Sequence, residues 1–206
     1  MQFLFDPDSK IMQIVSRICD IVILNFVFIL TCLPIFTIGA ANTALYAAVF
    51  PLDTEREGKL LSLYFQAFRR NFRQSTVIFL ILALFFGGTC LNMVRFSQLG
   101  GTLGYALFLL AMAVFVILAM VTAYVFPLLS QFCNSIRKSL ANALLLSIAH
   151  LPRTAVLVVI NCFPWVLMLV NLYAFMQLGF LWVFLYFGAA AYFNSRVLLK
   201  VFRPYL

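Results

Sequence analysis

The hydrophobic pattern is a series of long apolar runs separated by shorter, mostly basic polar intervals. The first run, residues 21–50, is interrupted by the sequence LPIFTIG at residues 33–39. A helix needs about 20 residues to cross the ~30 Å hydrocarbon core of a bilayer. Pro34 lacks an amide donor and clashes with a continuing helix. The run therefore forms either one kinked span or two helices, the second covering residues 40–50.

The segment around the break has the features of a tight turn between packed helices. Thr37 is a candidate cap for the second helix, and Gly39 permits a close approach of two backbones. The alanines that follow Gly39 give this helix small sides, which favour close helix packing in lipid. We interpret Pro34, Thr37 and Gly39 as a structural motif, and we favour this reading over a ligand site.

Four further apolar runs predict membrane spans at residues 75–94, 102–129, 154–172 and 180–198. Short turns at residues 95–101 and 173–179 join them in pairs. An amphipathic lead helix at residues 9–20 is expected before the first span, because its apolar positions share one helical face.

Two amphipathic helices are predicted on the cytoplasmic side. In residues 59–73 the apolar stripe consists of Leu61, Phe65, Phe68 and Phe72, with Lys59, Gln66, Arg70 and Arg73 opposite and Arg69 at the flank. Such a helix lies on a membrane surface. It serves either as an anchor or as a docking helix, and the candidate docking residues for a partner or lipid are Phe65, Phe68, Arg69, Arg70, Phe72 and Arg73. Residues 133–150 form the second helix.

The two surface helices precede similar hairpins of spans, which suggests a weak parallel repeat. The chain therefore reads as a single integral membrane domain in three parts. These parts are residues 1–58, 59–130 and 131–206, and each contains a pair of apolar helices.

The chain resembles the YesL family in three places. These are residues 33–39, the Ala44-Leu45-Tyr46 triplet, and the sequence FQAFRRNFRQS at residues 65–75. The family often has proline directly after the glycine, where this chain has Ala40. The resemblance implies a small bacterial cell-membrane protein of unassigned function. It also implies a gene context beside sugar-import transporters and glycoside-degrading enzymes.

Composition agrees with a membrane protein. Of 206 residues, 65% are hydrophobic and only 10% are charged, and the mean hydropathy is +1.08. A soluble domain carries about 25% charged residues. The net charge of +8 is explained by basic residues at the cytoplasmic ends of spans, so we expect the lipid bilayer rather than nucleic acid as the partner.

Counting charges favours six crossings over five. If the first run crosses twice, both termini are cytoplasmic, and 13 basic residues lie inside with only Arg95 outside. If it crosses once, Lys10 and Arg17 move outside and the tally becomes 11 and 3. The positive-inside rule prefers the first arrangement, whereas the shortness of the second helix argues for the second. We expect an all-α membrane helix bundle with six crossings, and five crossings is the alternative.

The sequence offers little for catalysis. All acidic residues precede position 58, no phosphate-binding loop or metalloprotease motif occurs, and the five cysteines include no CxxC pair. His150, the only histidine, has no acid or cysteine near it, although a general base needs positioned partners. We therefore expect no enzymatic activity, no cofactor and no metal site.

Two functional classes remain. The first is a non-enzymatic accessory or scaffold protein that works beside a carbohydrate importer and docks it through a basic cytoplasmic helix. The second is a small permease or channel for a neutral solute, with intramembrane amides lining its path. Those amides are Asn25, Asn42, Asn92, Asn161 and Asn171. Amides in membranes mostly bond neighbouring helices, so we favour the first class.

Overall fold

The computed structural model describes residues 10–52 and 59–204, and every regular element in this part of the chain is helical. Four helices contain stretches that are long and apolar enough to cross a membrane, namely Met12–Cys32, Leu60–Leu99, Gly101–Gln131 and Leu151–Val170. The all-helical prediction is thus confirmed. The elements are α1 (Lys10–Cys32), a 3-10 turn (Ile35–Thr37), α2 (Ile38–Val49), α3 (Leu60–Leu99), α4 (Gly101–Gln131), α5 (Ile136–Ala149), α6 (Leu151–Val170), α7 (Leu172–Gln177), α8 (Gly179–Leu181), a π-helical turn (Trp182–Tyr186) and α9 (Phe187–Phe202).

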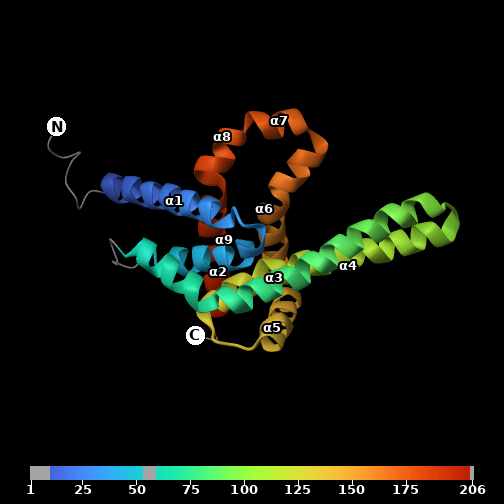
Figure 1. Cartoon of the computed structure of the whole chain (residues 1–206), viewed down its shortest axis with the longest axis horizontal. Coiled ribbons are helices and arrows are strands. Elements are labelled where there is room, and N and C mark those ends of the chain that lie inside the picture. Colours follow the sequence, from blue (N-terminus) through green and yellow to red (C-terminus); the bar gives the residue numbers. More distant parts are fainter. Residues whose placement is uncertain (1–9, 53–58, 205–206) are drawn as a thin grey trace.

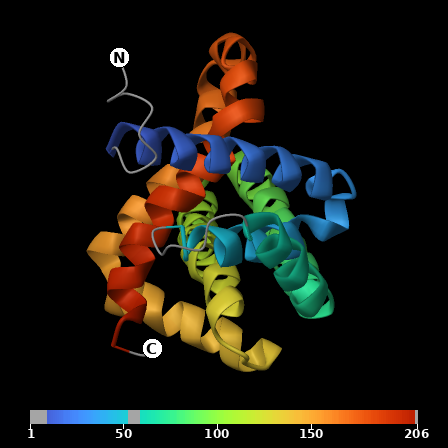
Figure 2. The same ribbon diagram turned by 90° about the vertical axis from the view of Figure 1, so that its left-hand side faces the viewer.

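The first apolar run forms two separate helices. α1 ends at Cys32 and α2 begins at Ile38, after the 3-10 turn that follows Pro34. The expected lead helix is not separate, because α1 continues without a break from Lys10 into the apolar run. Figure 2 shows α1 crossing over the upper part of α9, with α2 below α1 in the middle of the molecule.

α3 and α4 form a long hairpin that projects from the rest of the molecule (Figure 1). Residues 95–101 were expected to form a loop, but α3 continues to Leu99 and the reversal is confined to two glycines. Gly100 and Gly101 have φ angles of 61° and 66°, which L-residues with side chains rarely adopt. A second arm, α6 to α9, leaves the core in another direction (Figure 1). Its tip, expected as a plain turn, contains the short helix α7.

The expected boundary between a surface helix and a span near residue 74 is absent. α3 is one helix of 40 residues, about 60 Å long at 1.5 Å per residue. Neither proline nor glycine occurs between residues 60 and 86, so no residue interrupts the helix there. In the second half of the chain, α5 and α6 are distinct helices separated at His150, and Pro152 lies in the first turn of α6.

Small and polar side chains face the protein interior. The buried residues of α2 include Gly39, Ala40, Ala41, Ala44 and Ala48, and those of α5 are Ser139, Ala143 and Ser147. On α3 the buried side begins with Tyr64 and Ala67, whereas Leu61 and Phe65 of the predicted apolar stripe are exposed. The predicted stripe is thus divided, because Leu61 and Phe65 face outward whereas Phe68 is partly buried against the core. In lipid, small residues allow close helix contact and bulky apolar residues can face outward.

Candidate functional site

Three arginines near the start of α3 surround a hollow on the outside of the molecule. The hollow is about 330 Å³ and is lined by Phe68, Arg69, Arg70, Phe72 and Arg73. All three arginines are exposed. These are five of the six predicted docking residues. The sixth, Phe65, packs edge-on against Tyr64, with ring centroids 5.5 Å apart, and it extends the aromatic row along the helix.

A second hollow adjoins the first through Arg73. It has a volume of about 540 Å³, and its other walls include Gln74 on α3 together with Ser135, Ile136 and Arg137 at the start of α5. Gln74 Nε2 donates a hydrogen bond of 2.6 Å to the carbonyl of Asn134, which ties the connecting segment to α3. We call the two joined hollows, with Arg69, Arg70, Arg73 and Arg137, the basic surface.

Sequence reasoning missed Arg137 as part of this surface. Its charge was visible, but residues 73 and 137 are far apart in the chain, and only the packing of the segment 132–135 onto α3 brings them together. Arg70 supports this packing, because its guanidinium donates to the carbonyl of Ser130 at 3.5 Å. Among the described residues the only carboxylate side chain is that of Asp20 on α1, so the basic surface has no acidic side chain lining it.

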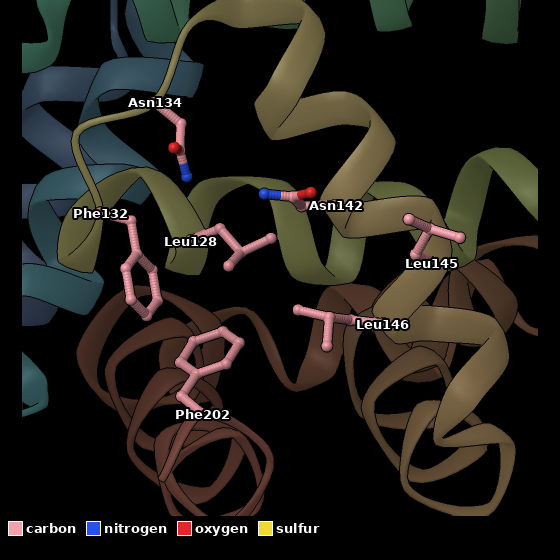
Figure 3. Close-up of a pocket in the computed structure, with 7 residues that line it drawn as sticks. All are labelled: Leu128, Phe132, Asn134, Asn142, Leu145, Leu146 and Phe202. Carbon is pink, nitrogen blue, oxygen red and sulfur yellow. The ribbon is translucent and has the colours of Figure 1, made fainter. Parts of the chain in front are cut away.

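An apolar pocket lies on the other side of the segment 132–135. It has a volume of about 330 Å³, and its walls come from the end of α4, the connecting segment, α5 and α9. In Figure 3 the rings of Phe132 and Phe202 form one side, and Leu145 and Leu146 form the other. The ring centroids of Phe132 and Phe202 are 5.9 Å apart. The pocket can accept an apolar side chain.

The predicted turn motif holds α2 close to its neighbours. Thr37 occupies the N-cap position of α2 but makes no capping bond. Its hydroxyl instead donates to the carbonyls of Thr31 and Pro34, both at 2.5 Å, and so satisfies groups left by the helix break. A Cβ at Gly39 would meet the carbonyl oxygen of Ser75 and lie 2.7 Å from Cβ of Phe79. The turn motif therefore packs directly against α3 at Gly39, which leaves no space for a ligand there.

Asn25 forms hydrogen bonds with the π-helical turn in the last apolar run. The π-helical turn leaves carbonyls of Trp182 and Val183 accessible, and Asn25 Nδ2 donates to them at 3.4 and 2.5 Å. Asn25 Oδ1 accepts a 2.8 Å bond from the amide of Gly188. All polar groups of this buried side chain are thus used in joining α1 to the last helical stretch.

The other predicted amides have different surroundings. Asn92 is exposed on α3, and Asn171 is exposed and caps α7 by accepting from the amide of Ala174 at 3.0 Å. Asn42 and Asn161 line a cavity of about 550 Å³ between α2, the α3–α4 hairpin and the second arm, which we call the interior cavity. The cavity is open on one side, where Asn161, Trp165 and Leu169 are exposed. Only these two of the five predicted amides line the same cavity.

The described residues contain no group of three or more His, Cys, Asp or Glu side chains that could hold a metal ion. All five cysteines are free thiols. The carbonyl of His150 accepts a hydrogen bond from Thr154 at the break between α5 and α6.

Residues 21–93 match the model of a family described as "Protein of unknown function, DUF624". The matched segment contains the turn motif and Arg69, Arg70 and Arg73, and the match is consistent with the YesL resemblance. Comparisons with curated proteins and with solved structures gave no match.

Proposed function

We propose that this protein is a non-enzymatic accessory or scaffold protein of the bacterial cell membrane, which docks a partner protein through the basic surface. The observation that carries the proposal is the gathering of four exposed arginines from two helices around joined hollows. Arginine presents a planar fork of donors that pairs with carboxylates. The fitting partner is therefore an acidic segment.

The apolar pocket supports a protein partner over a purely electrostatic contact with lipid. It lies beside the basic surface, because Phe132 and Asn134 line the pocket while Ser135 lines the second hollow. Protein interfaces combine a desolvated apolar anchor with a polar rim. The gene context that the YesL resemblance implies makes a carbohydrate importer the first partner to test.

For the topology we propose six crossings with both termini in the cytoplasm. The support is the charge count, since this arrangement leaves only Arg95 outside. The last crossing is the continuous helical stretch from α8 to α9, which the π-helical turn divides into shorter elements. The basic surface then lies on the cytoplasmic side.

The alternative, a permease for a neutral solute, has weaker support. A hydroxyl-rich solute such as a sugar needs a hydrogen-bonding partner for each hydroxyl during passage, because each unpaired group costs about 1–3 kcal/mol. The interior cavity is lined mostly by apolar side chains, among them Phe86, Phe115 and Trp165. It therefore offers few partners for the hydroxyls of a sugar.

The test replaces Arg69, Arg70 and Arg73 together by lysine and compares the proteins that co-purify from native membranes. We expect normal membrane levels and a reduced amount of one stoichiometric partner, because lysine keeps the charge but lacks the bidentate geometry. Arg95→Lys, on the far hairpin, is the matched control.

An unchanged set of partners in the triple lysine variant, with a reduced amount of protein in the membrane only when the arginines become glutamine, would identify the helix as a lipid anchor and refute docking. Uptake of sugar into liposomes that contain the pure protein would instead favour the permease.

A further inference from the structure

The interior cavity has the size and position of a ligand site. Its volume of about 550 Å³ falls within the ~300–1,000 Å³ typical of small-molecule sites. Its lining residues come from α1, α2, α3, α4, α6, the π-helical turn and α9. None of them carries a charge, so a bound molecule must be neutral, since an unpaired ion is costly in apolar surroundings.

A small polar cluster lies at one side of the cavity. Asn194, which is fully buried, donates through Nδ2 to the hydroxyl of Tyr46 at 3.2 Å and to Oδ1 of Asn161 at 2.9 Å. Tyr46 and Asn161 also line the cavity, so the cluster joins α2, α6 and α9 at its wall.

This cluster has unused hydrogen-bond donors. Within residues 10–52 and 59–204 the structure gives no acceptor for the Tyr46 hydroxyl hydrogen or for Nδ2 of Asn161, and no hydrogen bond for the side chain of Asn42. Thr122 and Tyr186 differ, because their hydroxyls already donate to the carbonyls of Leu118 and Ile160. The cluster also holds an acceptor without a partner, the buried Oδ1 of Asn194. The unused donors at the cavity wall call for an acceptor oxygen on the ligand.

We propose that the cavity binds a neutral lipid-like molecule with a hydroxyl or carbonyl oxygen at one end. That oxygen accepts hydrogen bonds from Asn42 and Asn161, while the hydrocarbon body lies against Phe86, Phe115 and Trp165. A plain acyl chain fits the apolar wall but leaves the donors unpaired. A sugar satisfies the donors but leaves most of its own hydroxyls against carbon.

The experiment uses the full-length purified protein and a photoreactive probe, a C16 alcohol with a diazirine in the middle of its chain. The matched probe is the same diazirine alkane without the hydroxyl. We expect the alcohol to label the peptide that contains Cys162 and Trp165, at an apparent affinity about tenfold above that of the alkane.

Asn42→Leu is the main variant, because the Asn42 side chain makes no hydrogen bond whose loss would disturb the fold. We expect about tenfold weaker labelling by the alcohol and unchanged labelling by the alkane. Asn92→Leu, which changes an exposed amide on α3, is the control and keeps full labelling. Ala119→Phe, which fills the cavity, weakens labelling by both probes.

Equal labelling by the two probes in the wild-type protein would identify an acyl chain as the occupant and overturn the proposal. So would equal alcohol labelling of Asn42→Leu and Asn92→Leu. If Asn42→Leu does not yield folded protein, the comparison of the two probes on the wild type and on Ala119→Phe decides alone.

Discussion

At the scale of single residues, small and polar side chains hold the helices together. The hydroxyls of Thr43 and Ser75 are 2.9 Å apart between α2 and α3, and those of Tyr64 and Thr31 are 2.6 Å apart between α3 and α1. Tyr124 and Thr154 make the corresponding contact between α4 and α6 at 3.0 Å. Each such bond contributes about 0.6 kcal/mol on average in a membrane protein, so packing depends on several of them.

Gly39 offers the sharpest test of this packing. Gly39→Ala places a Cβ against a backbone carbonyl of α3, and overpacking of this kind costs about 1–3 kcal/mol. We expect the unfolding midpoint in detergent to fall by about 3–10 °C, using the scaling for soluble chains of this length. Gly87→Ala is the matched control, because nothing lies within 4 Å of its Cβ position. Equal midpoints for the two variants would show that α2 and α3 are not tightly packed at Gly39.

At the scale of elements, the unbroken α3 distinguishes the two halves of the chain. Its N-terminal part carries the basic surface, and its C-terminal part forms the projecting hairpin (Figure 1). α5 and α6 contain the same succession of polar and apolar segments, but they are separated at His150. Because the position of Arg73 is fixed by a continuous helix, the basic surface is rigidly connected to the hairpin.

Spin labels test the continuity of α3. With cysteines at Ser62 and Asn92 on a cysteine-free background, a straight helix gives a separation of about 45 Å, since 30 residues rise by 1.5 Å each. Pulsed electron–electron double resonance in liposomes measures the distance between the two spin labels. A clearly shorter mean distance would show that α3 is bent or broken, as expected if residues 59–73 form a separate surface helix.

The hydropathy pattern predicted most helices, because length and apolar content suffice to identify spans. It did not predict which side of α3 packs inward, where the small Ala67 is buried and Phe65 is exposed. The proximity of Arg137 to Arg73 and the π-helical turn at Trp182–Tyr186 depend on tertiary contacts between segments far apart in the chain. Sequence periodicity describes only local structure, so it cannot predict contacts between segments that are far apart in the chain.

At the scale of the whole molecule, two diverging arms meet at α2 and the inner ends of α3, α4 and α9. Aromatic contacts mark this junction, where Phe202 packs against Phe50 and Phe132 with ring centroids 6.2 and 5.9 Å away. The basic surface and the apolar pocket lie near the junction, and the interior cavity lies between the arms. The proposed docking surface and the proposed ligand cavity thus occupy separate, neighbouring regions.

Thiol labelling in intact cells tests the six-crossing proposal. Single cysteines are placed at Gln13 on α1, at Ser97 near the hairpin tip and at Lys138 on α5. With six crossings, an impermeant maleimide labels Ser97→Cys only, because the other two positions are cytoplasmic. Labelling of Gln13→Cys as strong as that of Ser97→Cys would establish five crossings, whereas Lys138→Cys stays protected in both arrangements.

The shortness of α2 has a consequence for how the chain enters the bilayer during synthesis. At about 18 Å it reaches little more than halfway across the hydrocarbon core, and α3, α4 and α9, which cover it, are made later. A nascent chain that ends near residue 52 therefore has only α1 to shield this segment, so insertion of α2 into the bilayer is weakly favoured at that stage. Reporter enzymes fused at that point would record a transient intermediate, so the orientation of the first third of the protein must be measured on the finished chain.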